Sequence, residues 1–402
     1  MRRVVITGRG TINALGRDVP STLAAMRAGR SAIGSLEMRD LDRLTIRIGA
    51  QVRDHDEAAI FDRSELALYD RATQFAILSA REAMTEAGLE IASAGAERAG
   101  VILGTSGGGL TTQDANFRAV YEAGKNRVHP FVVPRLMANA AASHLSMLHN
   151  LKGPASTVST ACASSNHAIA QAVQIIRAGM ADVMLTGGAE AMLCFGGVKA
   201  WEGLRVMSTD TCRPFCATRS GMVQGEGAAV FVFEDREHAL ARGATILGEI
   251  AGIAMNADAA DIVAPSRDGA ARAMAGALRD AGLDPRDIGY INAHGTGTTA
   301  NDRTECAAIR EVLGSAADDV AVSSTKSMHG HCIGATGAIE LLACLMALTE
   351  GVIAPTANWC AADPECDLDV VPNVAREVPV TACLSNAFAF GGMNAVLALV
   401  TP

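Results

Sequence analysis

The chain has 402 residues, with 34 lysines and arginines against 43 aspartates and glutamates, so its formal net charge is −9. This acidic balance argues against a nucleic-acid-binding protein, which is usually basic. Hydrophobic residues make up 49% of the sequence but aromatic residues only 4%, which predicts a core of small and aliphatic side chains packed closely in α/β layers.

The first residues enter a strand at once and lack the apolar region and small-residue cleavage site of a secretion signal. Apolar runs such as 339–348 contain Glu340 and are shorter than the ~20 residues of a membrane span. Ten cysteines without zinc-ribbon spacing are expected to be reduced thiols, and Cys212 and Cys216 come nearest to a metal pair. We therefore predict a cytoplasmic protein without a membrane span.

An internal repeat organises the predicted elements. Each copy begins with a helix that ends in Ala-Gly-Leu, followed by a short strand that runs into a loop rich in glycine. The helix and the strand lie at 80–89 and 101–104 in the first copy, and at 270–283 and 290–293 in the second. This recurrence predicts two similar βαβ-rich halves, residues 1–250 and 251–402, fused into one unit.

The repeat continues with a second strand and a second helix in each copy. The strand covers 156–160 in the first copy and 322–326 in the second, and the helix that follows begins at Cys162 or near Gly334. The functional site is expected where the two halves meet.

Cys162 stands directly after a predicted strand and at the start of the helix 163–178. A thiol at a helix N-terminus faces the positive end of the helix dipole and unpaired N–H groups, which favour the thiolate and can bind an oxyanion. This position is typical of an activated nucleophile, with a buried structural cysteine as the alternative.

Two histidines follow strands of the second half. His294 leaves the strand 290–293 into a loop of glycine and threonine, and His331 follows the strand that the repeat pairs with the Cys162 strand. If a pseudo-twofold axis relates the halves, the segment 326–331 and Cys162 occupy equivalent positions and face one cleft. Two imidazoles and a thiol can perform acyl transfer; the alternative for each histidine is a loop residue whose hydrogen bonds are satisfied.

Three other patterns carry little support. Residues 104–108 match the G-x-S-x-G elbow of hydrolases, with Ser106 as nucleophile, but successive glycines start a helix badly. Residues 8–13 lack the third glycine of a dinucleotide-binding loop. His329 and His331 imitate a metal site without further ligands at suitable spacing, so no metal is predicted.

Four motifs together resemble one family. They are Thr160-Ala161-Cys162, Asn292-Ala293-His294-Gly295-Thr296, Lys326-Ser327 with Gly330-His331, and Ser385-Asn386-Ala387-Phe388-Ala389-Phe390-Gly391-Gly392. The chain resembles, over its whole length, the thiolase-fold condensing enzymes, specifically the ketoacyl-carrier-protein synthases of the fatty-acid-elongating type. The resemblance implies a duplicated five-layered αβαβα fold and a homodimer, or alternatively a heterodimer.

Three shorter stretches are similar to the nodulation protein E type of these synthases. They are Asp210-Thr211-Cys212-Arg213-Pro214-Phe215, Ala300-Asn301-Asp302 and Ser327-Met328-His329-Gly330-His331-Cys332.

The resemblance implies a decarboxylative condensation. Cys162 would take an acyl chain from a phosphopantetheine thioester of an acyl-carrier protein. His294 and His331 would bind the malonyl thioester carbonyl and stabilise the enolate that forms on loss of CO2, which gives a 3-oxoacyl-acyl-carrier protein two carbons longer. The phosphopantetheine arrives on the carrier protein, so no tightly bound cofactor is expected.

The same resemblance implies supporting roles. Backbone N–H groups of Cys162 and Phe390 would form the oxyanion hole, and Phe390 would also act as a gate. Lys326 and Glu340 would orient the histidines. The substrate-binding residues would be Thr296, Thr298, Gly107 and Phe388.

Two positions depart from the family pattern. Gly107 lies where many of these synthases carry a bulky aliphatic residue that limits the acyl pocket at the subunit interface, so we expect a longer, branched or unsaturated acyl primer. The helix start 63–71, which in the family is usually rich in lysine and arginine for docking the acidic carrier protein, reads Asp62-Arg63-Ser64-Glu65-Leu66-Ala67-Leu68 here. Docking is expected to rest instead on Lys125, Arg127, Arg205 and Arg213, unless these are ordinary solvated charges.

Two alternatives differ from the synthase in what they require. A non-catalytic partner subunit such as a chain-length factor would be expected to lose the nucleophile, and a Ser106 α/β hydrolase would not need Cys162 at all. The motifs leave open the acyl chain, the carrier protein and the pathway, which is fatty acid, polyketide or signal-lipid synthesis.

Overall fold

The computed structural model describes residues 1–93 and 95–402. Ten of its strands form one sheet. The N-terminal half-sheet contains β1 (Val4–Asn13), β4 (Ala99–Gly104), β5 (Ala155–Val158), β6 (Val183–Glu190) and β7 (Gly227–Asp235). The C-terminal half-sheet contains β8 (Gly248–Ala257), β9 (Tyr290–Asn292), β10 (Ala321–Ser323), β13 (Ala382–Ala389) and β14 (Met393–Val400).

The two half-sheets have the same topology. Their strand orders are β5-β4-β6-β7-β1 and β10-β9-β13-β14-β8, so each half-sheet is ordered third, second, fourth, fifth, first along the chain. In each, the first three strands of the order are parallel and the last two are antiparallel to their neighbours. A short antiparallel pairing of β1 with β8 joins the half-sheets. The repeat in the sequence therefore corresponds to a structural duplication, and the division expected after residue 250 falls inside β8.

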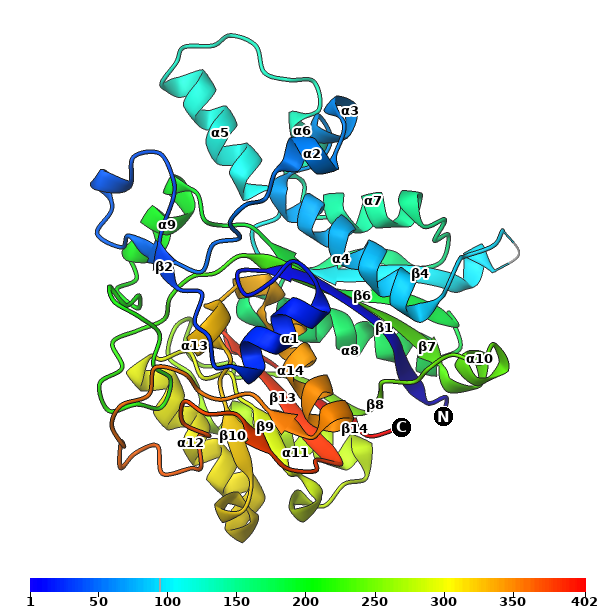
Figure 1. Cartoon of the computed structure of the whole chain (residues 1–402), viewed down its shortest axis with the longest axis vertical. Helices are drawn as coiled ribbons and strands as arrows, with labels where there is room; N and C mark the ends of the chain where they lie inside the picture. The colour runs from blue at the N-terminus through cyan, green and yellow to red at the C-terminus, as the bar shows by residue number, and fades with distance from the viewer. Residues whose placement is uncertain (94) are drawn as a thin grey trace.

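Helices form three layers around the two half-sheets (Figure 1). α4 (Arg71–Ala87) and α7 (Ala140–Leu148) cover the outer face of the N-terminal half-sheet, and α11 (Arg267–Ala281) and α12 (Thr299–Leu313) cover that of the C-terminal one. α8 (Ser164–Arg177) and α14 (Thr336–Glu350) lie between them and contact strands of both. This arrangement is the five-layered αβαβα architecture that the resemblance implied.

Shorter elements occupy the connections. The helices are α1 (Val19–Arg27), α2 (Glu57–Ile60), α3 (Arg63–Leu66), α5 (Leu110–Tyr121), α6 (Val132–Leu136), α9 (Phe195–Glu202), α10 (Arg236–Ala241) and α13 (Lys326–His329). Two small hairpins pair β2 (Gly34–Ser35) with β3 (Ile48–Gly49) and β11 (Val352–Ile353) with β12 (Arg376–Glu377). The 3-10 turns are η1 (Leu41–Arg43), η2 (Ala96–Arg98), η3 (Ala161–Ala163), η4 (Pro285–Asp287), η5 (Gly314–Asp318) and η6 (Ile333–Ala335).

Glycines let the outer helices approach the sheets closely. A Cβ atom at Gly10 of β1 would lie 2.0 Å from the carbonyl oxygen of Ser79 in α4. In the second half, a Cβ atom at Gly252 of β8 would lie 2.2 Å from the carbonyl oxygen of Ala277 in α11. Residues 8–13 are thus part of a strand packed under a helix, which explains their glycines without a dinucleotide.

The turns before the two central helices show which residues correspond between the halves. Ala161 before α8 and Ile333 before α14 both have a left-handed backbone, with φ of 47° and 44°. The counterpart of Cys162 is therefore Gly334. The expectation that the segment 326–331 is that counterpart is wrong, because this segment lies further upstream and begins with the short helix α13.

α14 is the most buried helix of the middle layer. With the turn before it, Ile333–Glu350, it is long and apolar enough by length and composition to cross a membrane, but 89% of this window is buried inside the molecule. Its side chains form part of the largest apolar cluster, which fills the space between the half-sheets. Its composition is therefore that of a core helix.

Candidate active site

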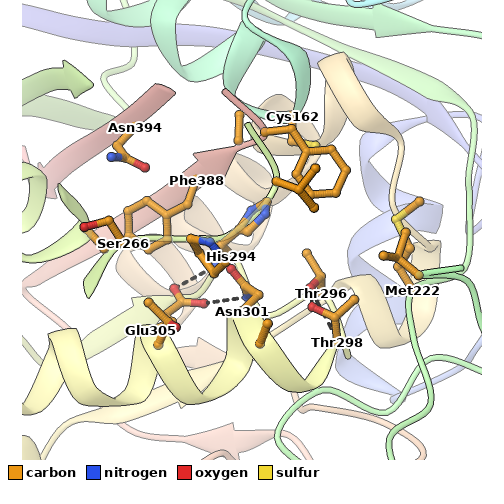
Figure 2. Close-up of a pocket in the computed structure, with 18 of the residues that line it drawn as sticks. Cys162, Met222, Ser266, His294, Thr296, Thr298, Asn301, Glu305, Phe388 and Asn394 are labelled. Carbon is orange, nitrogen blue, oxygen red and sulfur yellow. Dashed lines mark hydrogen bonds between the residues drawn. The ribbon is translucent and has the colours of Figure 1, made fainter. Parts of the chain in front are cut away.

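A cavity of about 120 Å³ opens where the two halves meet. Its lining includes Cys162 from the turn before α8, His294 from the loop after β9, His331 from the turn after α13, and Phe388 and Phe390 from the end of β13 and the loop after it. Figure 2 shows Cys162, His294 and Phe388 converging on this space. Residues more than 200 positions apart in the sequence are thus brought together.

Cys162 lies at the inner end of the cavity and is 5% exposed. The backbone N–H groups of Cys162 itself and of Phe390 both point at its sulfur. Burial raises the pKa of Cys162 to about 12, although the positive charge of Lys326 and the two N–H groups act in the opposite direction. The expected resting thiolate is therefore not found: in this closed cavity burial outweighs the helix N-terminus, and the sulfur keeps its proton.

The two histidine rings stand almost perpendicular to each other. Their centroids are 5.6 Å apart at an interplanar angle of 81°. Burial, and then the nearby charge of Lys326, holds the pKa of both His294 and His331 well below the ordinary value, so both rings are neutral at pH 7. Lys326 thus adds to the effect of burial on both rings from behind the lining of the site.

His331 has one ring nitrogen in use and one free. Its Nδ1 lies 2.8 Å from the hydroxyl of Thr336. Its Nε2 is buried and has no hydrogen-bond partner in the part of the chain that the structure describes. When Thr336 donates to Nδ1, the ring proton resides on Nε2, which then presents an N–H donor to the cavity.

The backbone of the His294 loop is held by Glu305 on α12. The N–H groups of His294 and Gly295 donate to the two carboxylate oxygens at 2.8 and 2.7 Å. Sequence reasoning missed Glu305, although three polar residues at helical spacing, Asn301, Asp302 and Glu305, indicate a polar face on this helix.

Lys326 and Glu340 form an ion pair behind the cavity. The distance from Nζ to Oε1 is 2.5 Å, and the two side chains are 0% and 1% exposed. Burial raises the pKa of Glu340 to about 7, against the lowering effect of Lys326. Neither residue lines the cavity, so their effect on the reacting groups is electrostatic and positional.

Glu190, at the end of β6, is a second carboxylate that sequence reasoning missed. It accepts hydrogen bonds from the N–H groups of Ser106 at 2.7 Å, Gly107 at 3.0 Å and Gly334 at 3.1 Å. It thereby ties the loop after β4 to the start of the central helix α14. Burial raises the pKa of Glu190 to about 7. The sequence contained one signal for this role, because Glu190 is a charged residue at the end of an otherwise uncharged strand.

This geometry also locates Ser106 and Gly107. Both lie outside the lining of the cavity, as far as the described residues define it. A Cβ atom at Gly107 would lie 3.3 Å from Glu190 and from the side chain of Met192, so the glycine leaves room for that methionine. No described histidine contacts Ser106, which gives the hydrolase hypothesis no support.

The mouth of the cavity carries the predicted threonines and several residues that were not predicted. The hydroxyl oxygens of Thr296 and Thr298 are 2.8 Å apart. Trp201 stacks on the gating candidate Phe390, with ring centroids 5.9 Å apart and an interplanar angle of 24°. Further lining residues that sequence reasoning missed are Val206, Met222, Ser266, Asn301 and Asn394.

Two family models match most of the chain. The models of the beta-ketoacyl synthase N-terminal and C-terminal domains match residues 1–239 and 247–359. The chain belongs to the beta-ketoacyl synthase family. It is an acyl-transferring condensing enzyme.

Individual relatives and structures agree with this family. The synthase is 53% identical to nodulation protein E of Rhizobium sp. (strain N33), over 99% of this chain and 98% of the relative. It is 40% identical to 3-oxoacyl-[acyl-carrier-protein] synthase 2 of Staphylococcus aureus (strain COL), over 98% and 97%. The implied nodulation protein E likeness is confirmed.

Two solved structures cover the whole of the synthase. The ishigamide ketosynthase/chain length factor has a TM-score of 0.95 at 37% identity, covering 100% of this chain and 99% of that one. A type II polyketide synthase acyl-carrier protein in complex with its ketosynthase has a TM-score of 0.90 at 30% identity, with the same coverage of 100% and 99%.

The four side chains expected to dock a carrier protein do not form one patch in the sequence: two follow α5, and two lie in the connection between α9 and β7. Lys125 and Arg127 are exposed on the loop after α5, which projects at one end of the molecule (Figure 1). Arg205 is exposed directly beside Val206 of the cavity lining. Arg213 is 2.7 Å from Asp210, so a carboxylate already compensates its charge. Asp62 and Glu65, the acidic residues of the helix start 63–71 and the position before it, form a capping box at the start of α3.

His329, which with His331 imitated a metal site in the sequence, lies at hydrogen-bond distance from two oxygen atoms of the protein. His329 Nδ1 lies 2.7 Å from the carbonyl of Gly330, and its Nε2 lies 2.9 Å from the hydroxyl of Thr325. Within residues 1–93 and 95–402, no group of three or more histidine, cysteine or acidic side chains is arranged to hold a metal ion.

Proposed function

We propose that this synthase condenses an acyl group carried on Cys162 with malonyl-acyl-carrier protein. The products are CO2 and a 3-oxoacyl-acyl-carrier protein that is two carbons longer. The observation that carries this proposal is the single cavity in which one thiol, two backbone N–H groups and two neutral imidazoles converge.

In the first step, the sulfur of Cys162 attacks the carbonyl carbon of the acyl thioester. The N–H groups of Cys162 and Phe390 receive the oxyanion that develops. Because burial raises the pKa of Cys162 to about 12, its proton leaves as the bond forms and ends on the departing pantetheine sulfur. The acyl group is then a thioester of Cys162.

In the second step, malonyl thioester enters the same cavity. Nε2–H of His331 donates to its carbonyl oxygen, and His294 acts as a second donor. These neutral donors stabilise the enolate that remains when CO2 leaves. The enolate carbon attacks the Cys162 thioester, and the oxyanion again lies at the two N–H groups. The sulfur of Cys162 departs as a thiolate and takes a proton from water, which restores the resting thiol.

Phosphopantetheine is proposed to reach the site attached to its carrier protein rather than as a resident cofactor. The hydroxyls of Thr296 and Thr298 at the cavity mouth suit its amide groups. For the carrier protein, Arg205 beside the mouth is the best-placed cation, with Lys125 and Arg127 as a second contact. We expect Arg205→Glu to raise KM for the carrier thioester, while Arg279→Glu, an exposed arginine on α11, leaves it unchanged.

A second copy of the chain is the proposed partner subunit. β5 is an edge strand of the sheet with exposed side chains. Large apolar side chains are exposed in the segments that precede it in the sequence, at Phe117, Tyr121, Phe131, Val133 and Met147. Patches of this kind mark protein interfaces. Light scattering should give the mass of a dimer, and the double variant Tyr121→Glu/Met147→Glu should shift this mass towards that of the monomer. A chain that is monomeric alone and reaches the mass of a dimer only when mixed with another ketosynthase chain would indicate a heterodimer.

The acyl chain is proposed to lie in a methionine-rich cluster. Cys162 shares an apolar cluster with Met207 and Met222, against which Met192 packs. Flexible thioether side chains adapt to long, branched or kinked chains. Intact mass of Cys162 after incubation with carrier thioesters of graded length and unsaturation tests this; much faster acylation by short saturated chains would contradict it.

All ten cysteines are free thiols, which supports the proposed cytoplasmic location.

Three variants test the mechanism as a whole. Cys162→Ala should abolish acylation and condensation, and His331→Ala should still be acylated but lose condensation. Ser106→Ala should keep both activities. An unmodified chain that is not acylated by any carrier thioester would favour the non-catalytic chain-length-factor role, and loss of activity in Ser106→Ala would favour the hydrolase.

A further inference from the structure

Two cysteines that are distant in the sequence, one from each half of the chain, face each other. Cys216 lies in the connection between α9 and β7, and Cys360 follows β11. The N–H of Ala217 donates to the carbonyl of Ala361 at 3.0 Å, which holds the two segments side by side. The sulfur atoms of Cys216 and Cys360 are 3.5 Å apart.

The two sulfurs differ in exposure and in their partners. Cys360 is exposed to solvent, whereas Cys216 is buried. The sulfur of Cys216 accepts the backbone N–H of Cys360 at 3.4 Å and lies 3.3 Å from the hydroxyl of Thr218. Burial alone would raise the pKa of Cys216, but these hydrogen bonds outweigh it and lower the pKa to about 7. A large fraction of this thiol is thus thiolate at neutral pH.

Two other pairs of thiols, Cys306 with Cys366 and Cys344 with Cys383, are buried at both members. Cys162 lies in the catalytic cavity, and burial raises its pKa to about 12. Cys194 is half-buried, burial raises its pKa to about 11, and no second thiol contacts it among the described residues. Cys194 is therefore a matched control for the pair.

We propose that Cys216 and Cys360 form a redox-active dithiol that a small-molecule disulfide such as oxidised glutathione converts to a protein disulfide. The exposed thiol of Cys360 attacks one sulfur of oxidised glutathione, which forms a mixed disulfide and releases one glutathione together with the thiol's proton. The thiolate of Cys216 then attacks the sulfur of Cys360, forms the internal disulfide and releases the second glutathione. The two cysteines lose two electrons and two protons, and the oxidised glutathione gains both.

The geometry suits this second attack. The sulfurs must approach from 3.5 Å to the ~2.05 Å of a disulfide, and the exposed side chain of Cys360 is free to turn. The neighbour of Cys216, Phe215, packs against Gly295 beside the catalytic His294, so the bond would form in the loop that supports the active site. The inference does not depend on the proposed condensation.

The test uses the full chain with Cys162→Ala, which removes the catalytic thiol from the count. After incubation with oxidised glutathione, intact mass should fall by two hydrogens without a retained glutathione, and peptide mapping should link Cys216 to Cys360. Dithiothreitol should reverse the change. Added Cys216→Ser should trap glutathione on Cys360, whereas added Cys360→Ser should leave Cys216 reduced.

The control variant is Cys194→Ser in the same background, which should form the disulfide at the same rate. A glutathione adduct that persists on Cys360 when both cysteines are present would overturn the proposal. So would a linkage between other cysteines, or unchanged mass after prolonged incubation.

Discussion

Removal of Lys326 is the perturbation whose result the structure predicts in most detail. Lys326→Met leaves the carboxylate of Glu340 buried at 1% exposure without the ammonium that lies 2.5 Å away. At an effective dielectric constant of 20, the direct attraction over this distance is about 7 kcal/mol, opposed by desolvation of several kcal/mol for each ion. The intact pair is thus close to neutral, whereas breaking it costs about 3–5 kcal/mol of unfolding free energy.

A double-mutant cycle separates this loss from the loss of packing. Lys326→Met and Glu340→Gln should each destabilise the protein by about 3–5 kcal/mol, since each leaves one buried charge unpaired. The double variant leaves neither charge, so it should lose less than the sum of the two by about 3 kcal/mol.

The pH dependence of Lys326→Met provides a second readout. In the unmodified protein, burial raises the pKa of Glu340 from 4.5 to about 7. The free energy of unfolding therefore falls as the pH rises from 4.5 to about 7. Without Lys326 this pKa rises further, so the free energy of unfolding continues to fall at pH values above 7. The difference in unfolding free energy between the two proteins should be constant below pH 7 and widen by about 1.4 kcal/mol per unit above it.

Equilibrium urea unfolding between pH 6 and pH 9 measures these quantities, with circular dichroism and tryptophan fluorescence compared to test for two-state behaviour. Lys152→Met removes an exposed lysine and should change stability by less than about 0.5 kcal/mol. Equal stabilities of the single Lys326 variant and the double variant, or a difference that stays flat from pH 7 to pH 9, would refute the reasoning.

Three further variants test other contacts. Glu190→Gln removes a carboxyl whose pKa burial raises from 4.5 to about 7. The unmodified protein loses stability as this carboxyl ionises, so the free energy of unfolding of the variant minus that of the unmodified protein should rise by about 3 kcal/mol between pH 5 and pH 8. A difference that does not change with pH would contradict this. Trp201→Ala removes the ring that stacks on Phe390, an interaction worth about 0.5–1.5 kcal/mol. Phe390 should then open more often, and alkylation of Cys162 by iodoacetamide should accelerate about 2- to 10-fold. An unchanged rate would show that the stacking does not hold Phe390 closed. Gly107→Leu should slow acylation by long chains but not by short ones, and equal slowing would exclude a role in chain length.

The sequence alone predicted the duplicated architecture and the residues proposed to react. The repeat was readable because helix ends and strand starts are local patterns that recur in both halves. Cys162 and His294 were readable because each follows a strand end, where α/β folds place reacting side chains. His331 follows the short helix α13 instead and was readable from the family motif. The glycines of β1 were readable as a compositional signal of close packing, although not as a contact with α4.

Only the tertiary structure decided the electrostatics and the long-range contacts. Local reasoning predicted a thiolate at Cys162, but the folded cavity buries this thiol and raises its pKa to about 12. The hydrogen bonds of Glu190 and the stacking of Trp201 on Phe390 join segments far apart in the chain, as does the approach of Cys216 to Cys360. Desolvation and charge–charge energies depend on three-dimensional distance, which sequence spacing does not contain.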